Sequence, residues 1–187
     1  MQKLTRARLL RSGAAAALAA SGAGALARSA AADVPSDADL AYGRLLVAVE
    51  LLADDFYTQA LGTGQLDTTA LHEARANERA HYAGLAAILT AAGQQPATAG
   101  DIDFSYPRRA FATGAALTQL GAQLETLQLG AYLGAADTLT SEPLRGIAAR
   151  IGANEAQHLT MFQPFRASFP VALSIEQASD ALGAYTS

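Results

Sequence analysis

Apolar residues recur every three or four positions along four long segments, the spacing that places them on one face of an α-helix. Asp37 or Asp39 is suited to cap the first segment, Asp67-Thr68 the second, and Pro107 fits the start of the third. The segments are residues 40–61, 68–92, 107–137 and the stretch from the turn at 140–143 to Pro164. The pattern predicts an all-α protein with a four-helix bundle as its core.

The connection between the second and third segments differs from the others. Residues 94–106 contain Pro96, Gly100, Asp101 and Asp103 and have no helical period. At roughly 3.3 Å per extended residue, this loop can span about 40 Å, the length of a helix of about 25 residues. We therefore expect one long crossover between helices two and three, with those helices parallel and the other connections short.

The chain length of 187 residues and its 51% hydrophobic content suit one domain with a full core. We expect the bundle to occupy residues 33–165. Residues 166–187 contain a short capped helical stretch from Ser174 to Leu182, which predicts a C-terminal tail packed on the bundle.

Polar residues interrupt the apolar faces at matching places. Two Asn-Glu-x-x-His runs lie at residues 77–81 and 154–158, and residues three apart on a helix point in nearly one direction. A glutamate also lies in the apolar stripe of the first and of the third helix. An isolated buried Glu usually pairs with Arg and an isolated His is usually a core residue, but four helices each contributing to one set favour a di-metal site. The predicted metal ligands are Glu50, Glu78, His81, Glu125, Glu155 and His158.

Charge balance supports this interpretation. Four buried carboxylates would be costly without counter-charge, and two divalent cations would neutralise them. An oxygen-rich set with two imidazoles suits iron or manganese better than zinc, and we expect iron before manganese. Glu50, Glu78 and His81 would serve one ion and the other three residues the second, with Glu78 and Glu155 bridging. Six ligands leave positions for water, dioxygen or peroxide.

The two halves of the chain repeat a further feature. Tyr57 follows Glu50 by seven residues, and Tyr132 follows Glu125 by seven. This agreement predicts one hairpin used twice about a pseudo-twofold axis. Each tyrosine is either a core residue with a hydrogen bond or a redox-active or supporting residue beside the metals.

The first 32 residues have the layout of an export signal. Basic residues precede an Ala-, Gly- and Leu-rich run that ends in Ala30-Ala31-Ala32, an A-x-A cleavage pattern. A membrane anchor and an ordinary first helix are the alternatives, but the run is short for a stable span and rich in glycine. The motif at residues 5–11 resembles a twin-arginine signal with Ala7 in place of the second arginine, so the export route stays open.

Removal of residues 1–32 would leave an acidic protein. Eight arginines against 17 acidic residues give a formal charge of −9, which disfavours nucleic acid as a partner. The chain has no Cys, and therefore neither a disulfide nor a cysteine for lipid attachment.

Four stretches carry a family resemblance. These are residues 46–57, 77–89, 125–136 and 147–162, and together they resemble the exported bacterial ferritin-like family that includes the desiccation-related proteins. The similarity extends over most of residues 37–165 and implies a ferritin-like fold with a diiron or dimanganese centre. By this resemblance the six predicted ligands match the family's metal ligands, whereas Ala53 stands where some relatives have a second glutamate on helix one.

Three functions are consistent with these features. The first is an exported ferroxidase-like or catalase-like oxidoreductase that protects the cell envelope. The second is a stress or desiccation protein in which metal serves folding rather than turnover. An iron-storage cage is less favoured, because the tail differs from a simple bundle end; a homodimer is compatible with the sequence.

Overall fold

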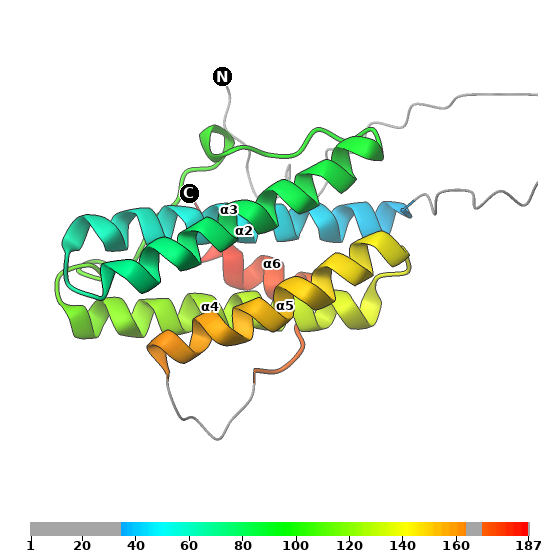
Figure 1. Cartoon of the computed structure of the whole chain (residues 1–187). Helices are drawn as coiled ribbons and strands as arrows, with labels where there is room; N and C mark the ends of the chain where they lie inside the picture. Colours follow the sequence, from blue (N-terminus) through cyan, green and yellow to red (C-terminus); the bar gives the residue numbers. More distant parts are fainter. Residues whose placement is uncertain (1–34, 164–169, 187) are drawn as a thin grey trace, which may run out of the picture.

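The computed structural model describes residues 35–163 and 170–186, and the described part consists of helices with loops and one isolated β-bridge (Figure 1). Within these residues, one 3-10 turn, η1, lies at Ala99–Asp101. Their α-helices are α2 (Asp37–Thr63), α3 (Thr68–Ala91), α4 (Gly114–Thr138), α5 (Glu142–Phe162) and α6 (Ile175–Gly183). The predicted all-α fold is confirmed.

The four long helices form two hairpins. α2 and α3 pack together through a short loop, as do α4 and α5. After α3 the chain runs back along the bundle, so that α4 starts at the end where α3 also starts and runs parallel to it (Figure 1). The long crossover predicted from the loop length is therefore present.

The helix boundaries follow from their caps. Ser36 caps α2, since its hydroxyl accepts a hydrogen bond from the Asp39 backbone while the Asp39 side chain accepts one from the Ser36 backbone. Helix α2 consequently begins at Asp37 rather than near Leu40, and neither expected aspartate is its N-cap. Asp67 caps α3 as predicted.

The third helix begins seven residues later than predicted. Residues from Pro107 onward form successive turns, with hydrogen bonds from the Ala110 amide to the Pro107 carbonyl and from the Ala112 amide to the Arg109 carbonyl, both 3.0 Å long. Arg109 has a φ of 69°, which is incompatible with a right-handed helix. The helix starts only after Thr113, whose hydroxyl accepts a hydrogen bond from the Ala116 amide. A proline suited to a helix start was therefore a misleading signal.

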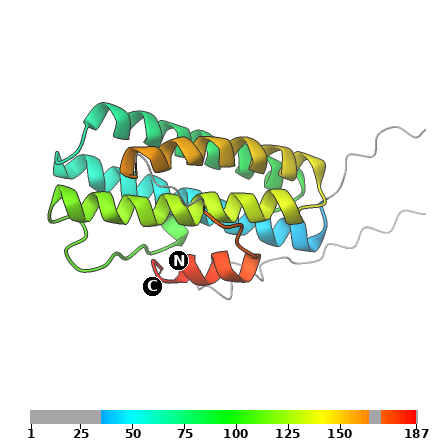
Figure 2. The same ribbon diagram turned by 90° about the horizontal axis from the view of Figure 1, so that it is seen from below.

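The C-terminal helix packs against α4 and α2 on one side of the bundle (Figures 1 and 2). The Leu173 amide donates to the Gly130 carbonyl at 2.9 Å, and the Tyr42 hydroxyl donates to the Leu173 carbonyl at 3.0 Å. A Cβ atom at Gly134 would lie 1.8 Å from that carbonyl oxygen, so glycine is required for this approach. The short helix predicted at residues 174–182 is present, with Ser174 as its N-cap.

None of the described helices is long and apolar enough to cross a bilayer. The predicted export signal, residues 1–32, and the start of the tail lie outside the residues that the structure describes.

Candidate metal centre

Each long helix brings one glutamate into the middle of the bundle. Glu50 of α2, Glu78 of α3, Glu125 of α4 and Glu155 of α5 are fully buried, each with 0% of its surface exposed. Their helices place them there because the same faces carry core residues such as Leu85 and Leu124, whose burial orients the helices. Four acidic side chains are thus enclosed in an apolar core.

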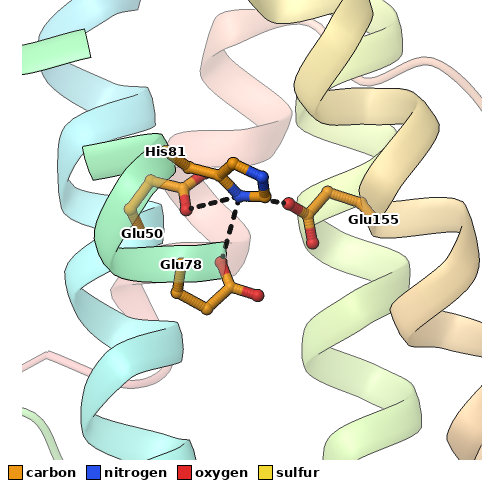
Figure 3. A group of neighbouring side chains, drawn as sticks. All are labelled: Glu50, Glu78, His81 and Glu155. Atoms are coloured by element: carbon orange, nitrogen blue, oxygen red, sulfur yellow. Dashed lines mark ion pairs between the residues drawn. The ribbon is translucent and has the colours of Figure 1, made fainter. Parts of the chain in front are cut away.

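One group of side chains surrounds His81. Its Nδ1 atom lies 3.0 Å from Glu155 Oε1, 3.4 Å from Glu50 Oε2 and 3.6 Å from Glu78 Oε2. Figure 3 shows that these carboxylates come from both hairpins and converge on one ring nitrogen. The ligand atoms of the four residues all lie within 4.8 Å of one another, which is compact enough to hold a metal ion.

The second group surrounds His158. Its Nδ1 atom lies 2.8 Å from Glu78 Oε1, 3.2 Å from Glu155 Oε2 and 3.9 Å from Glu125 Oε2. Glu78 and Glu155 belong to both groups, and each turns one carboxylate oxygen toward His81 and the other toward His158. Each of these two carboxylates therefore contributes to both groups, which is the placement that the predicted bridging role requires.

The oxygen atoms lie near the imidazoles without being fully hydrogen-bonded to them. Both oxygens of Glu78, one oxygen of each other glutamate and His81 Nδ1 are buried and lack a hydrogen-bond partner. The contacts around His81 are therefore ion-pair distances without an aligned hydrogen bond, and the atoms converge on a common space. Buried lone pairs of this kind need a cation or protons, and the donor set of oxygen with imidazole nitrogen fits iron or manganese.

Two tyrosines link the hairpins at this centre. The Tyr57 hydroxyl of α2 donates to Glu125 Oε1 of α4, and the Tyr132 hydroxyl of α4 donates to Glu50 Oε1 of α2. Both rings are buried. The exchange is reciprocal, which matches the pseudo-twofold repeat in the sequence, and it orients the carboxylate that each half contributes to a single group.

Burial and mutual repulsion shift the pKa values of the cluster. Burial raises the pKa of Glu78 well above its usual value, and the nearby charges of Glu155 and Glu50 raise it further. Burial also opposes the charged form of Glu155, but contacts with His158 and His81 outweigh it and lower the pKa of Glu155. Burial lowers the pKa of His81, yet its three carboxylate neighbours raise it to about 12. Protons and cations therefore compete for the same buried negative charge.

Sequence reasoning did not identify two further polar residues. The Asn77 side-chain amide lies 3.2 Å from His158 Nε2. The Asn shared by the two Asn-Glu-x-x-His runs was the sequence signal that could have predicted this contact. Gln128, one turn after Glu125, is 1% exposed, and neither of its amide atoms has a hydrogen-bond partner. Its spacing of three residues from Glu125 on the same helix was the signal that could have found it.

Comparison with known families agrees with this geometry. A family model described as a ferritin-like domain matches residues 38–167, which include all four long helices. This chain belongs to the ferritin-like domain family. A search of curated proteins finds no match.

Membership in the ferritin-like family and the cluster together support a di-metal carboxylate protein. The structure brings all six predicted ligands into two adjoining groups, and none of them lies elsewhere. Among the described residues, the two groups contain four carboxylates and two imidazoles, so two divalent ions would leave no net charge from the glutamates.

Proposed function

We propose that this protein is an exported ferritin-like oxidoreductase whose iron pair reacts with dioxygen or peroxide, as a ferroxidase or a catalase-like enzyme. The observation that carries the proposal is the presentation of both oxygens of Glu78 and Glu155 to two histidines, which provides two adjacent ion positions. Iron is preferred to manganese, and both suit this donor set.

The residues would divide the work as follows. Glu78 and Glu155 would bridge the ions, while Glu50 with His81 and Glu125 with His158 would each bind one of them. A bound iron pair supplies the capacity to exchange electrons with dioxygen or peroxide. Tyr57 and Tyr132 would hold the terminal carboxylates in place, and the enclosing leucines would exclude bulk water.

Export is part of the same proposal. Residues 1–32 carry basic residues, an apolar run and a cleavage pattern in the order of an export signal, and the region matched by the ferritin-like model begins after them. The proposed setting is therefore the cell envelope or beyond, with protection from oxidants as the role.

A second candidate function is metal binding without turnover. It is favoured by the complete burial of all four glutamates, because ions at such a site would stabilise the fold directly. In that case the protein would be a structural stress or desiccation protein, with metal-dependent melting and no redox activity.

Metal counting followed by a redox assay tests the proposal. The full-length precursor gene would be expressed in its native host, and the secreted or envelope form collected without added metal and analysed by mass spectrometry for metals per chain. We expect about two iron ions per chain, loss of both in Glu78→Ala, and no loss in Glu73→Ala, an exposed glutamate of the same helix.

The loaded protein would then be mixed with hydrogen peroxide, and the metal-free protein with Fe(II) and dioxygen. Rapid metal-dependent peroxide loss or Fe(II) oxidation supports the enzyme. Two bound ions with neither reaction would leave the structural candidate. A folded protein that binds no iron or manganese would contradict both.

A further inference from the structure

The two halves of the metal centre have the same ligands but different surroundings. Glu50 and Glu125 correspond, as do Glu78 and Glu155, and His81 and His158. A perfect twofold repeat would give two equivalent ion positions. The two halves differ in the residues beside the ligands. Two independent differences of this kind both favour tighter ion binding in the half that contains His158.

The first difference concerns the outer nitrogen of each histidine. Asn77 approaches His158 Nε2 at 3.2 Å, but its counterpart Asn154 donates instead to Gln157 Oε1 at 3.2 Å. Among the described residues, His81 Nε2 has no hydrogen-bond partner, and the His81 side chain is 12% exposed against 5% for His158. The His158 ring is thus contacted by Asn77 at the nitrogen that faces away from the carboxylates, whereas the His81 ring is partly exposed to solvent.

The second difference lies one turn beyond the terminal glutamates. Gln128 follows Glu125 by three residues, and Ala53 occupies the equivalent place after Glu50. Residues three apart on a helix are surface neighbours, so Gln128 lies next to Glu125 on α4. It is buried with both amide atoms unpartnered, whereas Ala53 offers only a methyl group.

We infer that the two ion positions are inequivalent. The position formed by Glu78, Glu125, Glu155 and His158 retains its ion, and the position formed by Glu50, Glu78, Glu155 and His81 exchanges its ion with solution. The exchanging position is the one that accepts a divalent substrate ion such as Fe(II). This inference rests on the proposed function, because it assumes that the cluster binds two ions.

The physical basis is the support behind each ligand. When His158 Nδ1 binds an ion as a neutral imidazole, Nε2 carries the proton, and a half-turn of the Asn77 amide places its oxygen to accept that proton's hydrogen bond. Such a partner fixes the ring orientation and is typically worth about 10–100-fold in metal affinity. His81 lacks this support, and its ring lies closer to solvent.

Gln128 adds to the same half. It is the helical neighbour of Glu125, and its buried amide carries an acceptor oxygen and an N–H donor that have no partner among the described residues; Glu125 Oε2 is likewise buried and unpartnered. Buried amide groups of this kind normally have a polar partner, and the described residues do not supply one for Gln128. Ala53 provides no polar group beside Glu50, so the ion position around His81 has no amide next to its terminal glutamate.

The test is a Mn(II) titration of the metal-free mature protein, with free Mn(II) measured by electron paramagnetic resonance. We expect two binding steps in the wild type, and one ion retained per chain during dialysis against a weak chelator. His81→Ala should keep the tight step, and His158→Ala should lose it. Equal affinities for both ions in the wild type would overturn the inference without touching the proposed function.

Asn77→Ala and Asn154→Ala form a matched pair, because the two residues are equivalent by the repeat. Asn77→Ala should weaken the tight step by about 10–100-fold and leave the weak step unchanged, whereas Asn154→Ala should leave both unchanged. Equal effects of the two variants would overturn the assignment to Asn77. Circular dichroism of each metal-free variant verifies that both are folded, and absence of any Mn(II) or Fe(II) binding in the wild type would contradict the proposed function as well.

Discussion

At the scale of single residues, the hydroxyl groups of Tyr57 and Tyr132 connect the two hairpins. Each donates to a buried carboxylate on the opposite hairpin, so each helix pair depends on the other to satisfy its charge. The sequence analysis left open whether these tyrosines were core residues or residues beside the metals. The structure places both hydroxyl groups in direct contact with a predicted metal ligand, while any redox role stays a prediction.

Removal of one such hydroxyl should destabilise the metal-free protein. In Tyr132→Phe, Glu50 Oε1 would lose its only hydrogen-bond donor among the described residues while remaining buried, at a cost of about 1–3 kcal/mol. Urea denaturation followed by circular dichroism would measure this loss in the free energy of unfolding. Tyr185→Phe is the control, because that hydroxyl makes no hydrogen bond in the described structure and should change stability by less than about 0.5 kcal/mol. Equal losses in the two variants would contradict this role.

At the scale of helices, one aspartate connects the two hairpins at the end of the bundle. Asp39 accepts hydrogen bonds from the Thr140 backbone amide at 2.8 Å and from its hydroxyl at 2.6 Å, and it also completes the cap of α2 with Ser36. Thr140 lies in the connection between α4 and α5. The start of α2 is thereby tied to the turn of the opposite hairpin.

We expect Asp39→Ala to lower stability by about 1–3 kcal/mol at pH 7. Burial raises the pKa of Asp39, but hydrogen bonds from Thr140 and Ser36 outweigh it and lower the pKa from 3.8 to about 2. A depressed pKa contributes stability above pH 3.8 that is lost as the pH falls through about 2. The difference between wild type and variant should therefore shrink between those pH values.

Chemical denaturation from pH 7 to pH 2 measures this effect. Asp37→Ala is the control, since Asp37 is exposed in the first turn of the same helix and makes no contact with the α4–α5 connection in the described hydrogen bonds. A pH-independent difference for Asp39→Ala would show that the carboxylate charge is not what stabilises the connection.

At the scale of the whole molecule, the metal centre is also the middle of the hydrophobic core. The bundle surrounds four buried glutamates with residues such as Leu45, Leu85 and Leu144, each 0% exposed. An apolar core gains stability from burial, while unneutralised carboxylates within it reduce that gain. Metal ions would therefore affect the stability of both hairpins together.

Addition of Mn(II) to the metal-free protein should raise its melting temperature. At 100 times the dissociation constant, one ion contributes about 2.7 kcal/mol, which corresponds to several degrees for a domain of this size. Differential scanning calorimetry with increasing Mn(II) measures the shift, and a chelator should reverse it. Glu155→Ala removes a carboxylate shared by both groups, so its melting temperature should no longer respond; the same rise in that variant would place the bound ions elsewhere.

The sequence by itself determined the helices, the hairpin order and the faces that carry the six candidate ligands. These depend on local properties: apolar periodicity decides which side of a helix is buried, and a three-residue spacing keeps Glu78 with His81 whatever lies opposite. The crossover followed from its length alone. The start of α4 could not be predicted in this way. The positive φ of Arg109 delays the first helical turn, and the presence of Pro107 gives no information about that backbone conformation.

Only the tertiary structure decided how the halves meet. Three contacts depend on the relative placement of helices from different hairpins. They are the histidine that each oxygen of Glu155 faces, the carboxylate that each tyrosine contacts, and the approach of Asn77, but not Asn154, to a histidine. Periodicity describes each helix about its own axis and contains no information on rotation or shift between axes. Two nearly identical motifs could therefore predict a symmetric pair of ligands, but packing between the hairpins made their surroundings different.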